Sequence, residues 1–396
     1  MAESTLAVPA WPAPDAHAQA HSETLVQLIR ERIAGSGALP FDRFMDLALY
    51  APGLGYYAAG SAKFGGAGDF TTAPELTPVF ARCIARHCAA WLEENPAWGI
   101  VEFGAGTGRL AADLLTSLEG SGRLPGYYAI VEPSPDLRAR QRATLAAQAP
   151  AIAERVSWWE TLPASPVDAV VIANEVLDAL PVKCLASGPA GLVERCVDHD
   201  GDGFRWVDRE PTPALSAHVR DYLADSLAPL EAGFRSECCV AAPAWLNSVA
   251  DLLSAGVLLL FDYGYPRHEY YHPQRAGGTL RCHYRHRAHD DVFFLPGLQD
   301  ITAAVDFTSL AEAADLAGFT VAGYTTQAAF LLGSGLEAVT GGGLDADPGA
   351  AARLKQLLLP GSMGEFVKAM LLTRNSSVQP GAFGFSDQRH RLLPTI

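Results

Sequence analysis

The chain contains no C-x-x-C pair in its 396 residues, and its seven cysteines are scattered and odd in number. Cysteine pairs at that spacing are typical of structural zinc sites, and even sets of cysteines are typical of disulfide frameworks. Neither scaffold is therefore indicated, and we predict no metal site. Unpaired thiols favour a reducing compartment, so we predict a cytoplasmic location.

Long hydrophobic runs are also missing. No uninterrupted apolar run approaches the ~18 residues that suggest a membrane-spanning helix. The first 22 residues are rich in Ala, Pro and His, and lack the cationic start and apolar centre of a secretory signal and the arginines of a mitochondrial presequence. We therefore predict no membrane insertion, and interpret residues 1–22 as a mobile tail that is dispensable for folding.

Positive charge is scarce. The chain has 29 lysines and arginines against 44 aspartates and glutamates, which gives a net charge of −15. Non-specific binding to nucleic acid needs a basic surface, so a nucleic-acid partner is not expected. An acidic balance suits a cationic substrate, although it also serves solubility alone.

The strongest positive signal is the stretch Ile100-Val-Glu-Phe-Gly-Ala-Gly-Thr-Gly-Arg-Leu110. An apolar run ends in Glu102, three alternating glycines follow at Gly104, Gly106 and Gly108, and a run with helical spacing comes next. This order predicts a strand, a tight turn and a helix. Dinucleotide-binding folds use G-x-G-x-x-G. The pattern E-x-G-x-G-x-G is instead typical of S-adenosylmethionine (SAM) methyltransferases, in which the helix N-terminus serves the methionine carboxylate.

A second apolar run, Tyr127 to Val131, ends in Glu132. An acid at the tip of the second strand of such a fold can bind both ribose hydroxyls of a nucleoside. The alternatives are an NAD site and a βαβ unit whose glycines only make a turn. The combination of the glycine turn with Glu132 favours SAM over both.

Seven apolar runs predict the strands of one buried sheet. They cover residues 99–103, 127–131, 156–159, 169–173, 257–261, 319–324 and 366–372. Continuous apolar runs predict strands that are buried on both faces, hence a parallel sheet. An antiparallel edge formed by the last two strands is usual in methyltransferase sheets, and we expect it here. Residues 184–245 interrupt the alternation of strands and helices, and Asp198 to Gly203 within them is interpreted as a hairpin turn.

Polar residues follow the predicted strand 169–173. The segment Asn174-Glu-Val-Leu-Asp-Ala-Leu-Pro181 differs from the N-P-P-Y form of amino-methylating nucleic-acid enzymes. Ligands bind beyond the carboxyl ends of the strands in open α/β sheets. Glu175 and Asp178 share one face of a helical turn, and such a carboxylate pair could hold a guanidinium. The alternative for Asp178 is a charge at a helix N-terminus.

Histidines 283, 286 and 289 are spaced by three in a region rich in Arg and Tyr. A zinc site is conceivable there, but the intervening Arg285 and Arg287 favour a basic surface loop.

Taken together, the chain resembles the MidA-like family of SAM-dependent methyltransferases, whose mitochondrial member is a protein-arginine methyltransferase needed for assembly of respiratory complex I. The matching pieces span residues 40 to about 370 and are Gly55-Tyr-Tyr57, Gly68-Asp-Phe-Thr-Thr-Ala-Pro-Glu75, Val101-Glu-Phe-Gly104, Val131-Glu-Pro133, Asn174 to Pro181, Asp262-Tyr-Gly264, Gly278-Thr-Leu-Arg281, Pro296 to Thr302 and Val305-Asp-Phe307.

The resemblance implies which residues carry function. It places Asn174 and Glu175 near the methyl acceptor, and five residues of a cofactor lid near SAM: Asp69, Thr71, Thr72, Pro74 and Glu75. Two departures from the family pattern stand out. Ala105 and Thr107 replace the proline and arginine of the usual G-P-G-R-G turn, and Ala304 stands where a histidine often precedes V-D-F.

We therefore predict a class I SAM-methyltransferase fold, which is a Rossmann-like α/β fold with a seven-stranded doubly wound sheet. Residues 23–96 would form an N-terminal helical lid region, residues 97–373 the core with an insertion at about 184–245, and residues 374–396 a C-terminal tail. The expected reaction is methyl transfer to an arginine nitrogen of a protein, with a respiratory-complex subunit as a candidate partner. The alternatives are a small-molecule N- or O-methyltransferase and a SAM-binding assembly factor without catalysis.

In that reading Glu175, Asn174 and Asp178 are the catalytic candidates. The cofactor candidates outside the lid are Glu102, Gly104, Gly106, Gly108 and Glu132.

Overall fold

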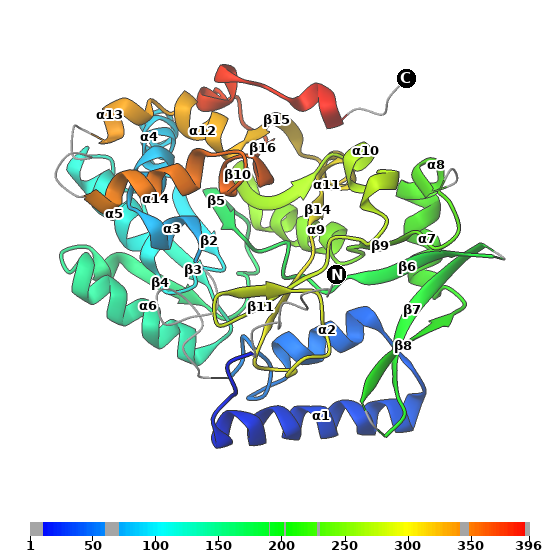
Figure 1. Cartoon of the computed structure of the whole chain (residues 1–396). Coiled ribbons are helices and arrows are strands. Elements are labelled where there is room, and N and C mark those ends of the chain that lie inside the picture. Colours follow the sequence, from blue (N-terminus) through cyan, green and yellow to red (C-terminus); the bar gives the residue numbers. More distant parts are fainter. Residues whose placement is uncertain are drawn as a thin grey trace, which may run out of the picture.

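The computed structural model describes residues 11–59, 71–189, 191–201, 203–227, 230–340 and 348–392. A central sheet lies between helices, and a second sheet lies beside it together with α1 (Ala16–Ser36) and α2 (Phe41–Tyr50) (Figure 1). Asp69 of the predicted lid lies outside the described residues.

The central sheet has the strand order β15-β16-β10-β5-β2-β3-β4, with β14 paired to β10. Its strands β2 to β5 and β10 are parallel, and β16 is antiparallel to both of its neighbours. The bounds are β2 (Gly99–Phe103), β3 (Tyr128–Val131), β4 (Val156–Trp159), β5 (Val167–Asn174), β10 (Leu253–Tyr265), β14 (Val305–Asp306), β15 (Thr320–Thr326) and β16 (Val367–Arg374).

The seven predicted strands all correspond to strands of this sheet, so the α/β class and the antiparallel edge agree with expectation. The sheet has eight strands in the described residues rather than seven. The sequence pattern misses β14 because a strand of two residues is too short to show any periodicity. It also underestimates β10, which runs for 13 residues.

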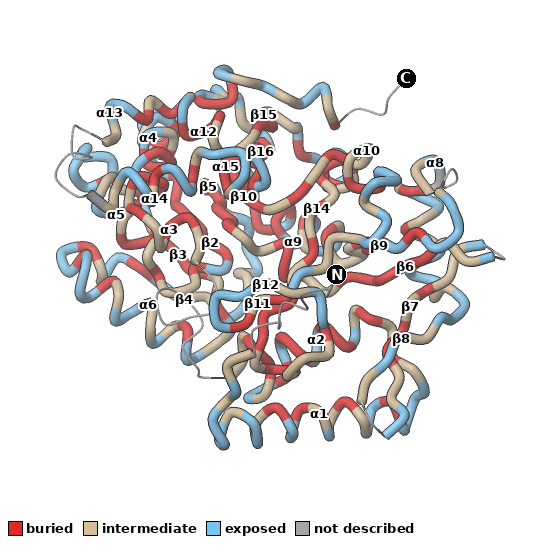
Figure 2. Tube along the Cα trace, viewed as in Figure 1, coloured by how far each residue is buried: buried red, intermediate tan, exposed pale blue. Residues whose placement is uncertain are grey.

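Helices cover both faces of the sheet. Along β5, Val170 and Ile172 pack with one set of helices, and Val171 packs with another. The first set contains α4 (Val79–Glu94), α5 (Arg109–Gly120), α12 (Gln327–Gly333) and α14 (Pro348–Leu358), and the second contains α9 (Ala242–Leu252) and α11 (Phe307–Leu316). Burial on both faces explains why the strands are continuously apolar, and Figure 2 shows this buried centre. The central fold therefore leaves ligand space only at the strand ends.

The remaining helices are short or peripheral. They are α3 (Ala73–Leu76), α6 (Pro135–Gln148), α7 (Pro213–His218), α8 (Ala224–Leu227), α10 (Arg267–Tyr270), α13 (Leu336–Thr340) and α15 (Met363–Phe366). None of the helices in the described ranges is both long and apolar enough to cross a membrane.

The second sheet forms largely from the interruption predicted at residues 184–245. It has the order β1-β7-β6-β9, with β8 paired to β7. The strands are β1 (Leu39–Pro40), β6 (Lys183–Gly188), β7 (Gly191–His199), β8 (Phe204–Arg209) and β9 (Arg235–Cys238). The expected hairpin turn connects β7 and β8. A third, small sheet has the order β12-β11-β13, with β11 (Arg281–Tyr284), β12 (Arg287–His289) and β13 (Asp300–Thr302).

Both expected tails need correction. The boundary at residue 22 falls inside α1, where the buried Ser22 donates a hydrogen bond of 2.8 Å to the carbonyl of Pro296. At the other end, Phe383 is buried against the core, within a short 3-10 helix that packs on α12. Sequence periodicity did not reveal these contacts because their partners lie far away in the chain.

Candidate functional site

A glycine turn connects β2 to α5 and forms one wall of a cavity. Gly104 and Gly106 have φ angles of 62° and 54°, in the left-handed region that side chains with a Cβ avoid. A Cβ on Gly104 would lie 2.8 Å from Val176 Cγ2, so this position also needs glycine for space. The turn brings bare backbone and the N-terminus of α5 to the cavity, where a carboxylate can be bound. Gly108 lies behind the turn, as the residue before α5.

Glu132 follows β3 and faces the same cavity. Its Oε1 accepts a hydrogen bond of 2.9 Å from the Ser134 amide, and its Oε2 accepts one of 3.1 Å from Gln141 Nε2. The same Gln141 nitrogen lies 3.1 Å from the Gly106 carbonyl, and Gln141 Oε1 accepts a bond from Trp158. Gln141 therefore fixes the acidic residue of the second strand relative to the glycine turn.

Glu102, at the end of β2, is almost fully buried. Tyr128 donates a hydrogen bond of 2.6 Å to its Oε2. Burial raises the pKa of Glu102 to about 7, and the bond from Tyr128 opposes that shift. Because its carboxyl already has a buried partner, Glu102 is a support for the turn as well as part of the cavity wall.

The segment predicted as a lid lies against the glycine turn. Thr72 precedes the short helix α3, and Thr72, Pro74 and Glu75 all line the cavity. Thr107 donates a hydrogen bond to the Glu75 carboxylate. The residue that replaces the usual family arginine thus holds α3 against the turn.

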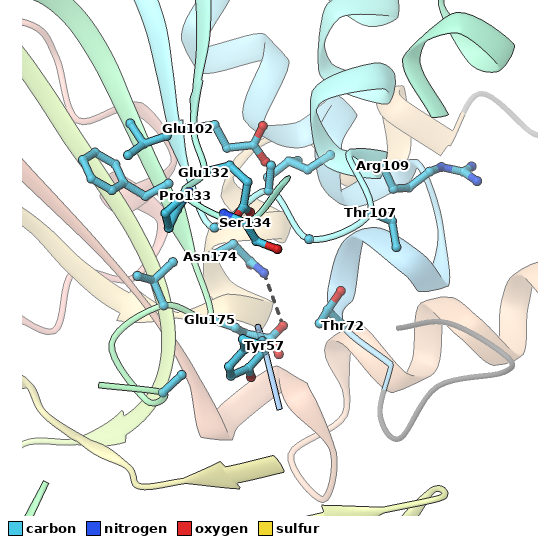
Figure 3. A pocket seen from close by; sticks show the side chains of 18 of the residues that line it. Tyr57, Thr72, Glu102, Thr107, Arg109, Glu132, Pro133, Ser134, Asn174 and Glu175 are labelled. Atoms are coloured by element: carbon cyan, nitrogen blue, oxygen red, sulfur yellow. Dashed lines mark hydrogen bonds between the residues drawn. The ribbon is translucent and has the colours of Figure 1, made fainter. Parts of the chain in front are cut away.

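These residues enclose a cavity of about 640 Å³, a size that suits a cofactor. Glu102 and Glu175 lie at opposite ends of it (Figure 3). The Asn174 side chain is buried, and its Oδ1 has no hydrogen-bond partner among the described residues. A buried unpaired acceptor in a ligand-sized cavity, next to bare glycine backbone and an acidic strand tip, fits a nucleoside-containing amino acid such as SAM.

The turn after β5 has an unusual backbone. Glu175 has a φ angle of 53°, a conformation that is rare for a residue with a side chain and is often found at functional sites. Its amide donates a bond of 2.8 Å to the Phe261 carbonyl, and Asn174 Nδ2 donates to its Oε1 at 3.3 Å (Figure 3). Asp262 Oδ2 accepts bonds from the next two amides, those of Val176 and Leu177.

A second cavity of about 370 Å³ adjoins the first. The two cavities share Tyr57 and Glu175, so these side chains lie at their junction. Asp178 and Asp300 line the second cavity only. Its walls therefore bring together three carboxyl groups, two from the turn after β5 and one from β13, and they also carry Arg275 and Arg281.

Burial raises the pKa of the carboxyl groups near the junction, and neighbouring charges add to the shift for Glu175 and Asp178. Burial and then Asp262 raise the pKa of Glu175 to about 8, against a weaker opposing effect of the Asn174 hydrogen bond. Burial raises the pKa of Asp262 to about 7, and burial with the charges of Asp262 and Glu175 raises that of Asp178 well above its usual range. A cation in the second cavity would relieve this repulsion.

The structure brings most predicted site residues to these two cavities. Asn174 and the cofactor candidates outside the lid line the first cavity, with the exception of Gly108. Thr71 and Asp178 line the second cavity. Sequence reasoning assigned no role to Tyr57, Gln141 or Asp300. Tyr57 and Asp300 lie within motifs that the chain shares with the family, and these motifs could have identified them. Nothing in the sequence distinguished Gln141.

The predicted basic loop forms β11, β12 and the turn between them. Within the described ranges, no three His, Cys, Asp or Glu side chains come together in a group that could hold a metal ion.

A family model described as an S-adenosyl-L-methionine-dependent methyltransferase matches residues 83–325. Among curated proteins, the chain is 29% identical over 328 residues to "Protein arginine methyltransferase NDUFAF7, mitochondrial" of Mus musculus, covering 74% of this chain and 70% of that protein. It is 27% identical to the protein of the same name in Danio rerio, covering 90% and 88% of the two chains.

Two solved structures from Burkholderia thailandensis are similar over nearly the whole chain. Both are 43% identical to it and cover 96% of this chain and 100% of their own, with TM-scores of 0.89 and 0.86. The first is bound to S-adenosyl-homocysteine, the product that SAM leaves after methyl transfer.

These comparisons correct one expectation. The cytoplasmic location predicted from cysteine usage is wrong, because the named relatives from mouse, zebrafish and human are mitochondrial proteins. Free thiols indicate a reducing environment, and that does not identify one compartment.

Proposed function

The chain belongs to the MidA-like family of SAM-dependent methyltransferases, and from this premise we propose that it transfers the methyl group to an arginine nitrogen of a protein substrate. The single observation that carries the proposal is the set of three carboxyl groups in the second cavity, which meets the cofactor cavity at Glu175. The names of the curated relatives as protein arginine methyltransferases support the same acceptor.

The carboxyl groups of the second cavity match the chemistry of a guanidinium. Arginine keeps its positive charge in water and presents five donors in a planar fork that suits carboxylates. Glu175, Asp178 and Asp300 provide carboxyl oxygens on the walls of the second cavity. A neutral acceptor, such as an alcohol, would not offset the like charges that raise the pKa of Glu175 and of Asp178.

In the cofactor cavity, we assign the ribose to Glu132 and the methionine carboxylate to the glycine turn at the N-terminus of α5. The Glu132 side chain is a carboxylate, whose oxygens are the acceptors that ribose hydroxyls would need. Thr72, Pro74 and Glu75 cover the cavity from the side of α3. This arrangement holds the methyl donor with its reactive end toward the junction at Glu175.

SAM supplies a methyl group on a positively charged sulfur. The attacking guanidine nitrogen forms the new bond to the methyl carbon while the carbon–sulfur bond breaks and its electron pair stays on sulfur. The guanidinium must also lose one proton, and Glu175 is the group at the junction that can accept it. Burial and Asp262 raise the pKa of Glu175 to about 8, and a bound guanidinium favours its ionised form, which is a stronger base than an ordinary carboxylate.

Orientation supplies the rest of the rate enhancement. Asp262 holds the turn that carries Glu175 through bonds of 3.1 and 2.8 Å to two successive amides. Asp262 is therefore a positioning residue. Fixing nitrogen, carbon and sulfur in line removes most of the entropic cost of the encounter.

The test is to incubate the full chain with radiolabelled SAM and a lysate of its source cells. The expected result is a labelled protein band whose acid hydrolysate contains dimethylated arginine. Label found only in small molecules would instead support a small-molecule methyltransferase on the same fold. SAM binding without any labelled product would support an assembly factor that lacks catalysis.

A further inference from the structure

A third cavity, of about 280 Å³, lies next to the acceptor cavity and has no part in the reaction described above. The two cavities share Gly278 and Arg281. The third cavity is formed by β6, β7, β8 and β9 of the second sheet together with the segment that leads into β11. Its walls carry three arginines, Arg195, Arg235 and Arg281.

Arg195 is the central feature of this cavity. In the sheet register it lies opposite Cys184, which on its other side lies opposite Glu237, so the three side chains share one face of the sheet. The Arg195 guanidinium stacks 4.3 Å from the ring centre of Trp206, and its side chain is only 17% exposed. Its nearest carboxylate is the largely exposed Asp208, at 3.9 Å.

No group among the described residues accepts a hydrogen bond from the Arg195 guanidinium. A guanidinium has five donors, and a largely buried one normally finds acceptors for them. Arg235 lies two residues before Glu237 and therefore on the same face. It is exposed, and no described residue accepts a hydrogen bond from its guanidinium. Burial first, and then the positive charge of Arg235 with others, lowers the pKa of Arg195.

Two acidic residues also line this cavity, and neither accepts a hydrogen bond from Arg195, although the charge of Glu237 acts to raise the Arg195 pKa. Asp290 pairs with Arg281 instead. The Glu237 Oε2 accepts both the amide and the hydroxyl of Thr279, and burial raises the pKa of its carboxyl to about 7. The cavity therefore has three arginines against two acidic residues, and the Arg195 donors lack acceptors among the described residues. The neighbouring acceptor cavity carries three carboxyl groups.

We propose that the third cavity binds the carboxylate of an aspartate or glutamate side chain in the same polypeptide that presents the acceptor arginine. This inference rests on the proposed function and specifies its substrate as a segment with an arginine and a nearby acid. An extended chain advances about 3.3 Å per residue, so a separation of one to five residues covers neighbouring cavities. The α-carboxylate of free arginine is the other source of the same chemistry.

The experiment uses the full chain in the presence of S-adenosyl-homocysteine. The probes are capped heptapeptides that contain one arginine and one glutamate, separated by one to five residues, each with a twin in which glutamine replaces the glutamate. Calorimetry measures binding, and labelled SAM measures transfer to the same peptides. At the best separation we expect the glutamate peptide to bind roughly tenfold more tightly than its twin, as charge-assisted hydrogen bonds allow.

Three variants identify the site. Arg195→Gln should reduce the glutamate preference to within about twofold, and Arg235→Gln should reduce it by a smaller factor. Arg235 is exposed, so this second variant keeps the test valid if the first does not fold. Arg205→Gln is the matched control, because Arg205 lies on the neighbouring β8 but pairs with Asp198 and Asp200 instead of lining the cavity. It should keep the full preference.

The carboxylate site and the proposed arginine methylation can be disproved independently of each other. Equal binding of both twins at every separation, or a preference that survives in Arg195→Gln, overturns the carboxylate site even if arginine is methylated. A preference that depends on Arg195, without any transfer to arginine, supports the carboxylate site and overturns the proposed function. Methylation of free arginine but of none of the peptides overturns the polypeptide substrate.

Discussion

The Tyr57 hydroxyl donates a hydrogen bond of 2.9 Å to Asp300 Oδ1, although the two residues lie 243 positions apart. Tyr57 lies at the junction of the cofactor and acceptor cavities, and Asp300 lies on the wall of the acceptor cavity. The bond therefore connects the N-terminal helical region to the loop that carries β13, and it orients one of the three acceptor-cavity carboxyl groups.

Tyr57→Phe should lower methyl transfer while SAM affinity stays close to that of the parent. The ring remains, and a hydrogen bond to a carboxylate is lost, which corresponds to a roughly tenfold effect or somewhat more. Steady-state kinetics beside SAM calorimetry measure both quantities. The control is Tyr127→Phe, whose hydroxyl bonds the Asp168 carbonyl away from both cavities. Loss of SAM binding in Tyr57→Phe would place the hydroxyl with the cofactor instead.

Glu175→Gln should leave SAM affinity almost unchanged, because Glu132 and the glycine turn are intact. Transfer should fall by roughly 10²–10⁴, the range for losing a positioned acid–base group. Glu154→Gln, at an exposed glutamate, controls for the loss of one negative charge. Label transfer and calorimetry on the same preparations test the prediction, and unchanged transfer would remove Glu175 from the mechanism.

The raised pKa of Glu175 predicts how stability depends on pH. Between its usual pKa of 4.5 and the folded value of about 8, the folded protein keeps a proton that the unfolded chain releases. The folded state therefore loses stability as pH rises through this window. Asp262, with a pKa of about 7, acts in the same direction.

Thermal unfolding at pH 6, 7 and 8 should show a falling Tm for the parent and a shallower fall for Glu175→Gln, which cannot ionise. Glu154→Gln should follow the parent. Parallel slopes for all three proteins would show that Glu175 does not titrate in this range.

Gly106→Val should abolish SAM binding while the protein stays folded. Gly106 has a φ angle of 54° in the wall of the cofactor cavity, where a branched side chain is strained and blocks the backbone. Gly122→Val is the matched control. Gly122 also has a positive φ, of 70°, but a Cβ there meets nothing within 4 Å. Circular dichroism and SAM calorimetry distinguish strain from occlusion, and equal loss of binding in both variants would indicate strain alone.

A chain that begins at Glu23 should melt several degrees lower than the parent, contrary to what the sequence pattern suggests. It lacks the first residues of α1, the buried bond from Ser22 to Pro296 and the 2.8 Å bond between His21 and the Leu54 carbonyl. A chain that begins at Trp11 keeps these contacts and should keep its Tm. Equal melting temperatures for the two shortened chains would show that residues 11–22 add nothing to stability.

The sequence by itself determined the parts of this protein that depend on neighbouring residues. Apolar runs located the main strands because both faces of the sheet are buried, and Glu132, Asn174 and Glu175 were found because each follows such a run. The glycine turn was equally visible, since its backbone conformation restricts which residues can stand there.

Only the tertiary structure decided which of these groups meet. Tyr57 contacts Asp300, and Gln141 connects Glu132 to Gly106. Arg195 lies in a cavity in which no described residue accepts a hydrogen bond from it. All three arrangements bring together segments far apart in the chain. The pKa of Glu175 likewise depends on burial and on Asp262, which stands on another strand. Patterns of neighbouring residues do not reveal such distances, because these distances are set only when the strands and loops pack together.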